Sequence, residues 1–213
     1  LTFAMGTGDS NTVIGKKAAH DLSTGSRNII VGADAGQVMT NNNDNVIIGT
    51  DAFESANGGE NGNIVMGTDS LQAMNQATGD GVVAIGHEAL KTLNVANPRT
   101  VAIGMRVGKL ATTATKSVYI GWDAVGAGNA TGADNIVIGD NAAANLQSGH
   151  SSIYIGSNAG VAVIDNIDNV AIGHNAFASA NSAENYNIAI GTDALGSETT
   201  GASSCVAIGY EAL

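Results

Sequence analysis

The stretch NIAIGTDAL at residues 187–195 is one copy of a motif that recurs along the whole chain. Close copies are NVIIGTDAF at 45–53, NIVMGTDSL at 63–71, NVAIGHNAF at 169–177 and CVAIGYEAL at 205–213. The glycine within the motif returns every 17–19 residues and marks twelve copies: Gly15, Gly32, Gly49, Gly67, Gly86, Gly104, Gly121, Gly139, Gly156, Gly173, Gly191 and Gly209. Regular self-similarity at this period predicts a solenoid in which each copy forms one coil.

The repeat also indicates how the chain is divided into domains. Because no linker interrupts it, residues 1–213 are predicted to form one domain. TFAMG at 2–6 resembles a shortened thirteenth copy. The chain begins without Met and ends inside a copy, so we expect it to be an excerpt of a longer polypeptide.

The residues before each glycine predict a short strand that is apolar on both faces. We number positions from the glycine as zero and call the twelve residues at one position a column. Column −1 is Ile, Val or Met throughout, and column −3 is Val or Ile except at Thr12. Column −2 is apolar in every copy and points to the opposite face, because side chains alternate along a strand. A coil this short covers one face, so we expect another copy of the protein to cover the other. We assign that inter-chain packing to column −2, with these residues: Val13, Ile30, Ile47, Val65, Tyr119, Val137 and Tyr154.

The residues after each glycine change period. Apolar residues follow at +3, +4 and +7, which is helical spacing, and Asp, Glu or Asn precedes them at +2 in ten copies. This pattern predicts a short helical turn with a polar N-cap, and a second short strand is the alternative. The glycine itself indicates either a positive φ or a close backbone approach. Asn occupies column −4 in seven copies and predicts a ladder of stacked amides.

Composition excludes several classes of partner. The net charge of −11 argues against nucleic acid, which needs a clustered basic face. The sequence has no apolar run of about 18 residues, the length that a membrane span needs, so we expect no membrane insertion. Phosphate-binding and nucleophile-elbow motifs are absent, and we expect no enzyme and no cofactor. Asp34, Asp51 and Asp69 occupy successive coils, and we interpret them as caps, with cation binding along this column as the alternative.

Column +1 varies most, which indicates a position that faces outward. Its aromatic and imidazole side chains are the candidate ligand contacts: Trp122, Tyr210, His87 and His174. Aromatic faces can stack on sugar rings.

The motif resembles two families of fibrous proteins. NVAIGHNAF (169–177) and NIAIGTDAL (187–195) resemble the N-T-A-[IV]-G-x-x-A-L repeats of phage tail fibres and the head repeats of trimeric autotransporter adhesins. The leucine after the alanine favours the tail-fibre group. The resemblance implies a parallel β-roll and a homotrimer, with no catalytic residues in the repeats.

These observations predict a mainly β fold, a parallel β-solenoid of about twelve 17–18-residue coils that assembles as a homotrimer. The expected function is a structural and binding segment of a viral tail fibre at the virion surface or another extracellular site. Its expected partners are other copies of itself and a host glycan or protein receptor. A bacterial surface adhesin, a polysaccharide-degrading tailspike and an ice- or mineral-binding solenoid are the alternatives.

Overall fold

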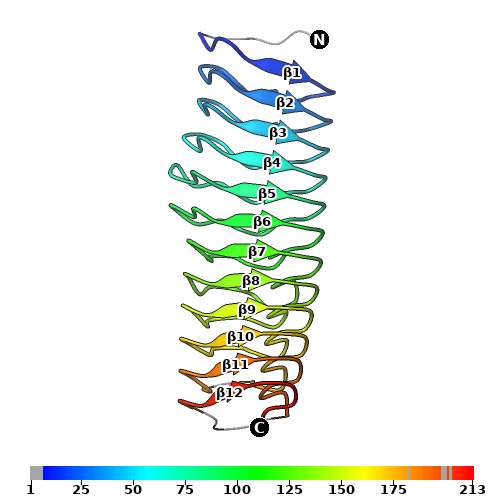
Figure 1. Ribbon diagram of the computed structural model, residues 1–213. Coiled ribbons are helices and arrows are strands. Elements are labelled where there is room, and N and C mark those ends of the chain that lie inside the picture. Colours follow the sequence, from blue (N-terminus) through cyan, green and yellow to red (C-terminus); the bar gives the residue numbers. More distant parts are fainter. Residues whose placement is uncertain (1–6, 182, 198–200, 202) are drawn as a thin grey trace.

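The computed structural model describes residues 7–181, 183–197, 201 and 203–213, and these form a β-solenoid (Figure 1). Twelve strands make one parallel sheet in chain order. The strands are β1 (Thr12–Ile14), β2 (Ile29–Val31), β3 (Val46–Ile48), β4 (Ile64–Met66), β5 (Val83–Ile85), β6 (Val101–Ile103), β7 (Val118–Ile120), β8 (Ile136–Ile138), β9 (Ile153–Ile155), β10 (Val170–Ile172), β11 (Ile188–Ile190) and β12 (Val206–Ile208). The predicted solenoid is thereby confirmed, while the thirteenth copy expected at 2–6 lies outside the described residues.

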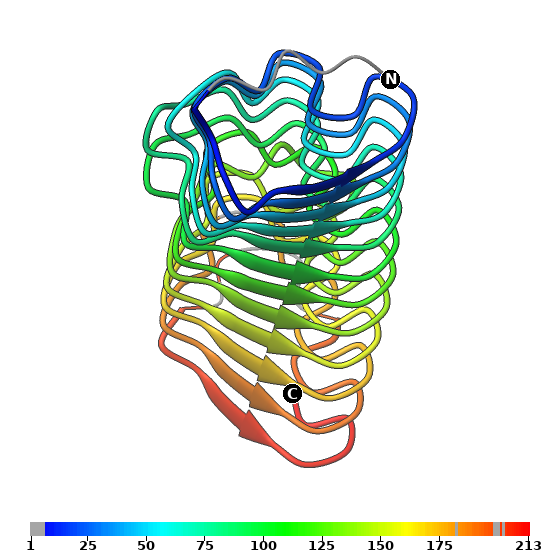
Figure 2. The same ribbon diagram turned by 90° about the horizontal axis from the view of Figure 1, so that it is seen from above.

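The register of the sheet aligns each column of the repeat. Ala102 of β6 pairs with Tyr119 of β7, which pairs in turn with Val137 of β8. All eleven strand pairs keep this register, so every strand residue lies beside its counterpart in the next coil. Viewed from above, the strands form one continuous wall and the loops close the coil behind it (Figure 2).

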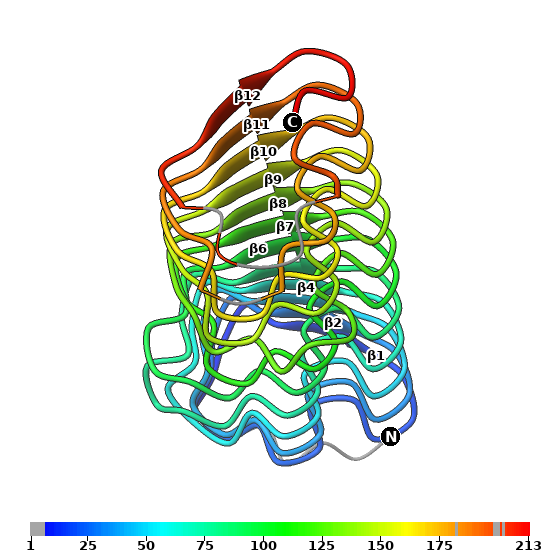
Figure 3. The same cartoon turned by 90° about the horizontal axis from the view of Figure 1, so that it is seen from below.

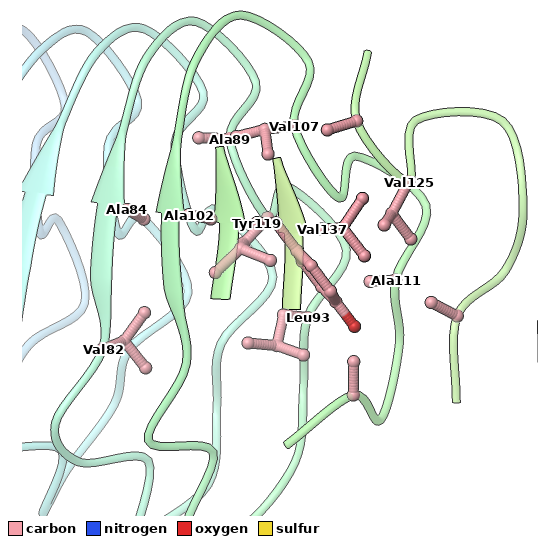
Figure 4. Packing of buried hydrophobic residues seen from close by; sticks show 14 of the residues in the cluster. Val82, Ala84, Ala89, Leu93, Ala102, Val107, Ala111, Tyr119, Val125 and Val137 are labelled. Carbon is pink, nitrogen blue, oxygen red and sulfur yellow. The ribbon is translucent and has the colours of Figure 1, made fainter. Parts of the chain in front are cut away.

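Column −2 faces the interior of the solenoid, which corrects the expectation that it packs against other chains. Ile30, Ile47, Val65, Tyr119, Val137 and Tyr154 are 0% exposed within the single chain, and Val13 is partly buried against the same core. Figure 4 shows the Tyr119 ring extending inward from β7. The interior makes room for it, because a Cβ at Gly108 would lie 3.3 Å from a Tyr119 ring carbon.

The other strand face is the one left uncovered. We define the outer face as columns −3 and −1, which hold Ile, Val or Met in every strand except at Thr12. Its side chains are half-buried or exposed, and the exposed ones range from 36% at Met66 to 67% at Ile208. The sequence therefore predicted two apolar faces correctly, but it assigned the inside and the outside the wrong way round.

The segment after each glycine is not helical. Among the described residues no helix is present, and none could therefore span a membrane. At Asp51 (+2) φ is 54° and at Phe53 (+4) it is 55°. Such values interrupt a right-handed helix. The N–H of Asp51 donates to Ala33 of the coil before, and that of Phe53 donates to Ser70 of the coil after. Bonds between coils therefore replace bonds within a helix, and Asp and Asn suit +2 because they tolerate positive φ.

Both reasons proposed for the glycine column hold. Gly104 has φ +141°, and a Cβ there would lie 2.7 Å from the carbonyl carbon of Gly121. This region of φ is restricted to glycine. The backbones of successive coils thus approach each other at the glycine, and the close approach fixes the distance between coils along the stack.

The asparagine ladder predicted for column −4 is present. The Oδ1 of Asn28 accepts the backbone N–H of Asn45, and the Oδ1 of Asn45 accepts that of Asn63. Their Nδ2 atoms donate to carbonyl oxygens of the next coil, for example Asn45 to Glu60 at 3.1 Å. The side chain of each buried Asn therefore forms hydrogen bonds with backbone N–H and C=O groups that lie outside the three-residue strand.

Candidate functional site

The four candidate ligand contacts of column +1 all face outward. Trp122 is 53% exposed, Tyr210 is 72% exposed, and His87 and His174 are exposed. The coils that carry them are separated along the stack, because Trp122 follows β7, Tyr210 follows β12, His87 follows β5 and His174 follows β10. The structure does not gather them into one site.

Trp122 nevertheless belongs to a local cluster. The Arg106 guanidinium lies over its ring at 5.9 Å from the centroid. This separation is typical of a cation–π interaction. The same guanidinium forms a two-pronged ion pair with Asp123, with Nε donating to Oδ1 at 2.8 Å. This hydrogen-bonded pair raises the pKa of Arg106 and fixes the guanidinium between the indole and the carboxylate.

A second charged cluster lies on the neighbouring coils. Lys91 Nζ lies 3.0 Å from Asp69 and 3.2 Å from Glu88, and Lys109 Nζ lies 2.8 Å from Glu88. The hydrogen bond from Lys109 lowers the pKa of Glu88, and the one to Asp69 raises the pKa of Lys91. These pairs join three successive coils.

Cation binding was the alternative interpretation of Asp34, Asp51 and Asp69 in column +2. Asp69 is bound to Lys91. Burial, followed by the charges of Glu54, Asp69 and Asp34, raises the pKa of Asp51. Within the part of the chain that the structure describes, no three Asp, Glu, His or Cys side chains converge as a metal site would require.

Two hollows lie along the edge of the solenoid that carries columns +2 and +5. The first, of about 350 Å³, is lined by Arg106, Lys109, Leu110, Asp123, Gly126, Ala127, Asn141 and Ala144. The second, of about 730 Å³, is lined by Val161, Asn175, Ala178, Ser179, Asp193, Gly196, Ser197, Glu211 and Leu213. Both hollows open between the same two columns, one in the coils after β6 to β8 and the other in the coils after β9 to β12.

Sequence reasoning did not identify these hollows, although a signal for them exists. Column +5 holds long side chains in the first coils, such as Gln72, Lys91 and Lys109, and small ones later, such as Gly126 and Ala144. A change of side-chain volume within one column of a solenoid predicts a groove. Reading each column for volume as well as polarity would have located it.

Three buried polar groups were also missed. The Glu60 carboxylate is fully buried, with Oε2 bonded to Asn42 at 2.6 Å and to the N–H of Gly58. Its Oε1 and the hydroxyls of Tyr119 and Tyr154 have no hydrogen-bond partner. Burial raises the pKa of Glu60 and raises that of Tyr154 to about 12.

Comparisons with protein-family models, with curated proteins and with solved structures found no significant match.

Proposed function

We propose that this chain is a structural and binding segment of an extracellular fibre, because its repeat resembles the repeats of viral tail fibres. The observation that carries the proposal is the outer face, two apolar columns that run along twelve strands and are interrupted only at Thr12. Stacking at the strand spacing gives this face a length of roughly 53 Å. A narrow rod with one apolar side is suited to a shaft built from several parallel chains.

The extent of the outer face supports self-association. Its more exposed side chains keep a third to two thirds of their surface accessible and the others stay partly accessible. Together they present an apolar area on the order of 1,000 Å². Monomeric proteins rarely expose contiguous apolar patches above roughly 600 Å², and a stable interface buries about 800 Å² from each partner. In a homotrimer the three outer faces would meet at a common axis, and repetition along the rod would give multivalent attachment to a host surface.

Mass in solution tests the proposed assembly. We expect light scattering to give three times the 21.2 kDa chain mass. The substitutions Ile103→Lys and Ile136→Lys place charges on the outer face and should dissociate the trimer, because each charge would lose its water. Met105→Lys is the matched control, since Met105 is 44% exposed but lies in column +1. A folded wild-type monomer of 21.2 kDa, or a trimer that survives both outer-face substitutions, would contradict the proposal.

A further inference from the structure

Columns +2 and +5 line both hollows, and we define the edge groove as these two columns in the later coils. Its wall is column +2, with Asn141, Asn158, Asn175, Asp193 and Glu211. The backbone of these residues is in register, because each N–H donates to the carbonyl of column +1 in the coil before, as Asn158 does to Asp140 at 2.9 Å. From the coil after β6 to the coil after β12 the edge groove is roughly 29 Å long at the strand spacing. Figure 3 shows the coils that follow β6 to β12 in green to red.

The floor of the edge groove is built from small side chains. Column +5 holds Gly126, Ala144, Ala178 and Gly196 here, with Val161 as the one larger residue. The same column holds longer side chains before Gly126, namely Gln37, Glu54, Gln72, Lys91 and Lys109, and Lys109 lines the upper end of the first hollow. The groove therefore exists because side chains become shorter while the backbone stays the same.

The wall presents hydrogen-bonding groups at every coil. Asn158 Nδ2 donates to Asn175 Oδ1 at 3.2 Å, and Asn175 Nδ2 donates to Asp193 Oδ1 at 2.9 Å. An amide has two N–H donors and two acceptor lone pairs, so each Asn keeps a donor and an acceptor beyond this chain of bonds. A regular row of such groups matches a ligand that both donates and accepts hydrogen bonds at regular intervals.

We propose that the edge groove binds a linear, uncharged glycan chain, with its sugar rings over the small floor and its hydroxyls on the amide wall. The inference rests on the proposed function, because it specifies the receptor to which such a fibre would attach. Hydroxyl groups satisfy both the donors and the acceptors of Asn. At the upper end, Arg106 lines the groove and also covers Trp122, so a ligand there changes the surroundings of the indole.

Charge and shape favour this occupant over others. Asp193 and Glu211 would repel a polyanion at the lower end, and the net charge of −11 opposes one throughout. An extended peptide bound in this way needs a free strand edge and pockets for alternate side chains. The wall here is made of side chains, and the floor is made mostly of Gly and Ala. An uncharged glycan is insensitive to the change from the paired charges of the upper end, such as Arg106 with Asp123, to the acidic lower end.

The experiment uses Trp122, which is the only tryptophan in the chain. Linear hexasaccharides of glucose, mannose and galactose are titrated separately into the purified protein while tryptophan fluorescence and calorimetric heat are followed. We expect at least one of them to bind saturably and to shift the fluorescence. Absence of saturable heat with all three, or binding of sulfated chains alone, would overturn the proposal.

Substitutions locate the binding. Ala144→Gln together with Ala178→Gln should weaken it at least about tenfold, because glutamine fills column +5 as it does at Gln72. Asn175→Gly removes one amide at a positive-φ position without backbone strain and should weaken binding about three- to tenfold. Gln37→Ala is the control in an earlier coil and should change nothing. Unchanged affinity in folded groove variants would overturn the assignment.

The two proposals fail in different ways. A trimer that binds none of the glycans would contradict the edge groove alone, since the mass tests the outer face. A monomer whose glycan binding is lost in the filled variant would contradict the fibre assembly and leave the edge groove in place.

Discussion

Replacing Gly104 by alanine should destabilise the solenoid more than a glycine substitution at an open turn, for two separate reasons. The residue has φ +141°. Only glycine adopts this region readily, and forcing an alanine into it costs about 1–3 kcal/mol. The new Cβ would also lie 2.7 Å from the carbonyl carbon of Gly121. Relieving that overlap means separating two coils, and overpacking of this kind costs about a further 1–3 kcal/mol.

The separation would act on the bonds that hold the coils together. Gly121 N donates to Ile103 at 2.9 Å, and Asp123 N donates to Met105 at 3.1 Å. Both bonds lie within the contact that the Cβ would widen. We therefore expect Gly104→Ala to lower the free energy of unfolding by about 2–6 kcal/mol, and hydrogen exchange to accelerate first in β6 and β7.

Gly62→Ala is the matched control for this prediction. Gly62 also has positive φ, +66°, but a Cβ there would meet nothing within 4 Å. Asp44 occupies the same column with φ 60°, so the position accepts a side chain. The control should cost about 1 kcal/mol. Denaturant unfolding followed by circular dichroism compares the two variants. Equal losses for Gly104→Ala and Gly62→Ala would refute the close-approach argument.

Three further substitutions test other features of the coil. Lys17 has φ 55°. Because Asn tolerates positive φ better, Lys17→Asn should stabilise the fold by about 0.5–1 kcal/mol in thermal unfolding, whereas Lys16→Asn should not, and equal effects would contradict this. Tyr154→Phe should raise the free energy of unfolding by about 1 kcal/mol, because the buried hydroxyl has no partner; a loss of similar size would reveal one. Burial raises the pKa of Glu60, so the folded protein favours the protonated carboxyl group. The contribution of this group to the free energy of unfolding is complete below the unfolded pKa of about 4.3, and it is lost as pH rises through the folded pKa. Glu60→Gln should flatten that loss in denaturation measured across pH. An unchanged pH dependence in the folded Glu60→Gln variant would contradict this argument.

The solenoid, its register and the role of the glycines could be predicted because they follow from spacing alone. The inside and the outside could not be told apart by alternation, since both faces of the strand are apolar. The variation of side-chain volume within each column does distinguish the inner face from the outer face. Column −2 ranges from Ala102 to Tyr119, and Gly108 compensates for the ring, as expected only of an enclosed interior. The outer columns stay almost uniformly Ile and Val.

The prediction of a helical turn after each glycine was wrong for a different reason. Asp or Asn before an apolar residue is a signal shared by helix N-caps and by positions with positive φ. What decides between them is the neighbouring coil, which takes the N–H groups that a helix would use internally. Leu90 and Val125 adopt positive φ only because this pairing imposes it, and no local propensity predicts that for such residues.

Under the two proposals, the uniform columns serve assembly and the variable columns serve recognition. Residues of the outer face vary little, because every coil must present the same surface if identical chains pack along the whole rod. Column +5 changes from Lys91 to Gly126 without disturbing the stack, because the coil-to-coil bonds come from the backbone. A change there reshapes the edge groove and leaves the outer face as it was. If the chain is the proposed fibre segment and the edge groove is its binding site, substitutions in columns +2 and +5 would change the receptor while the shaft remains the same.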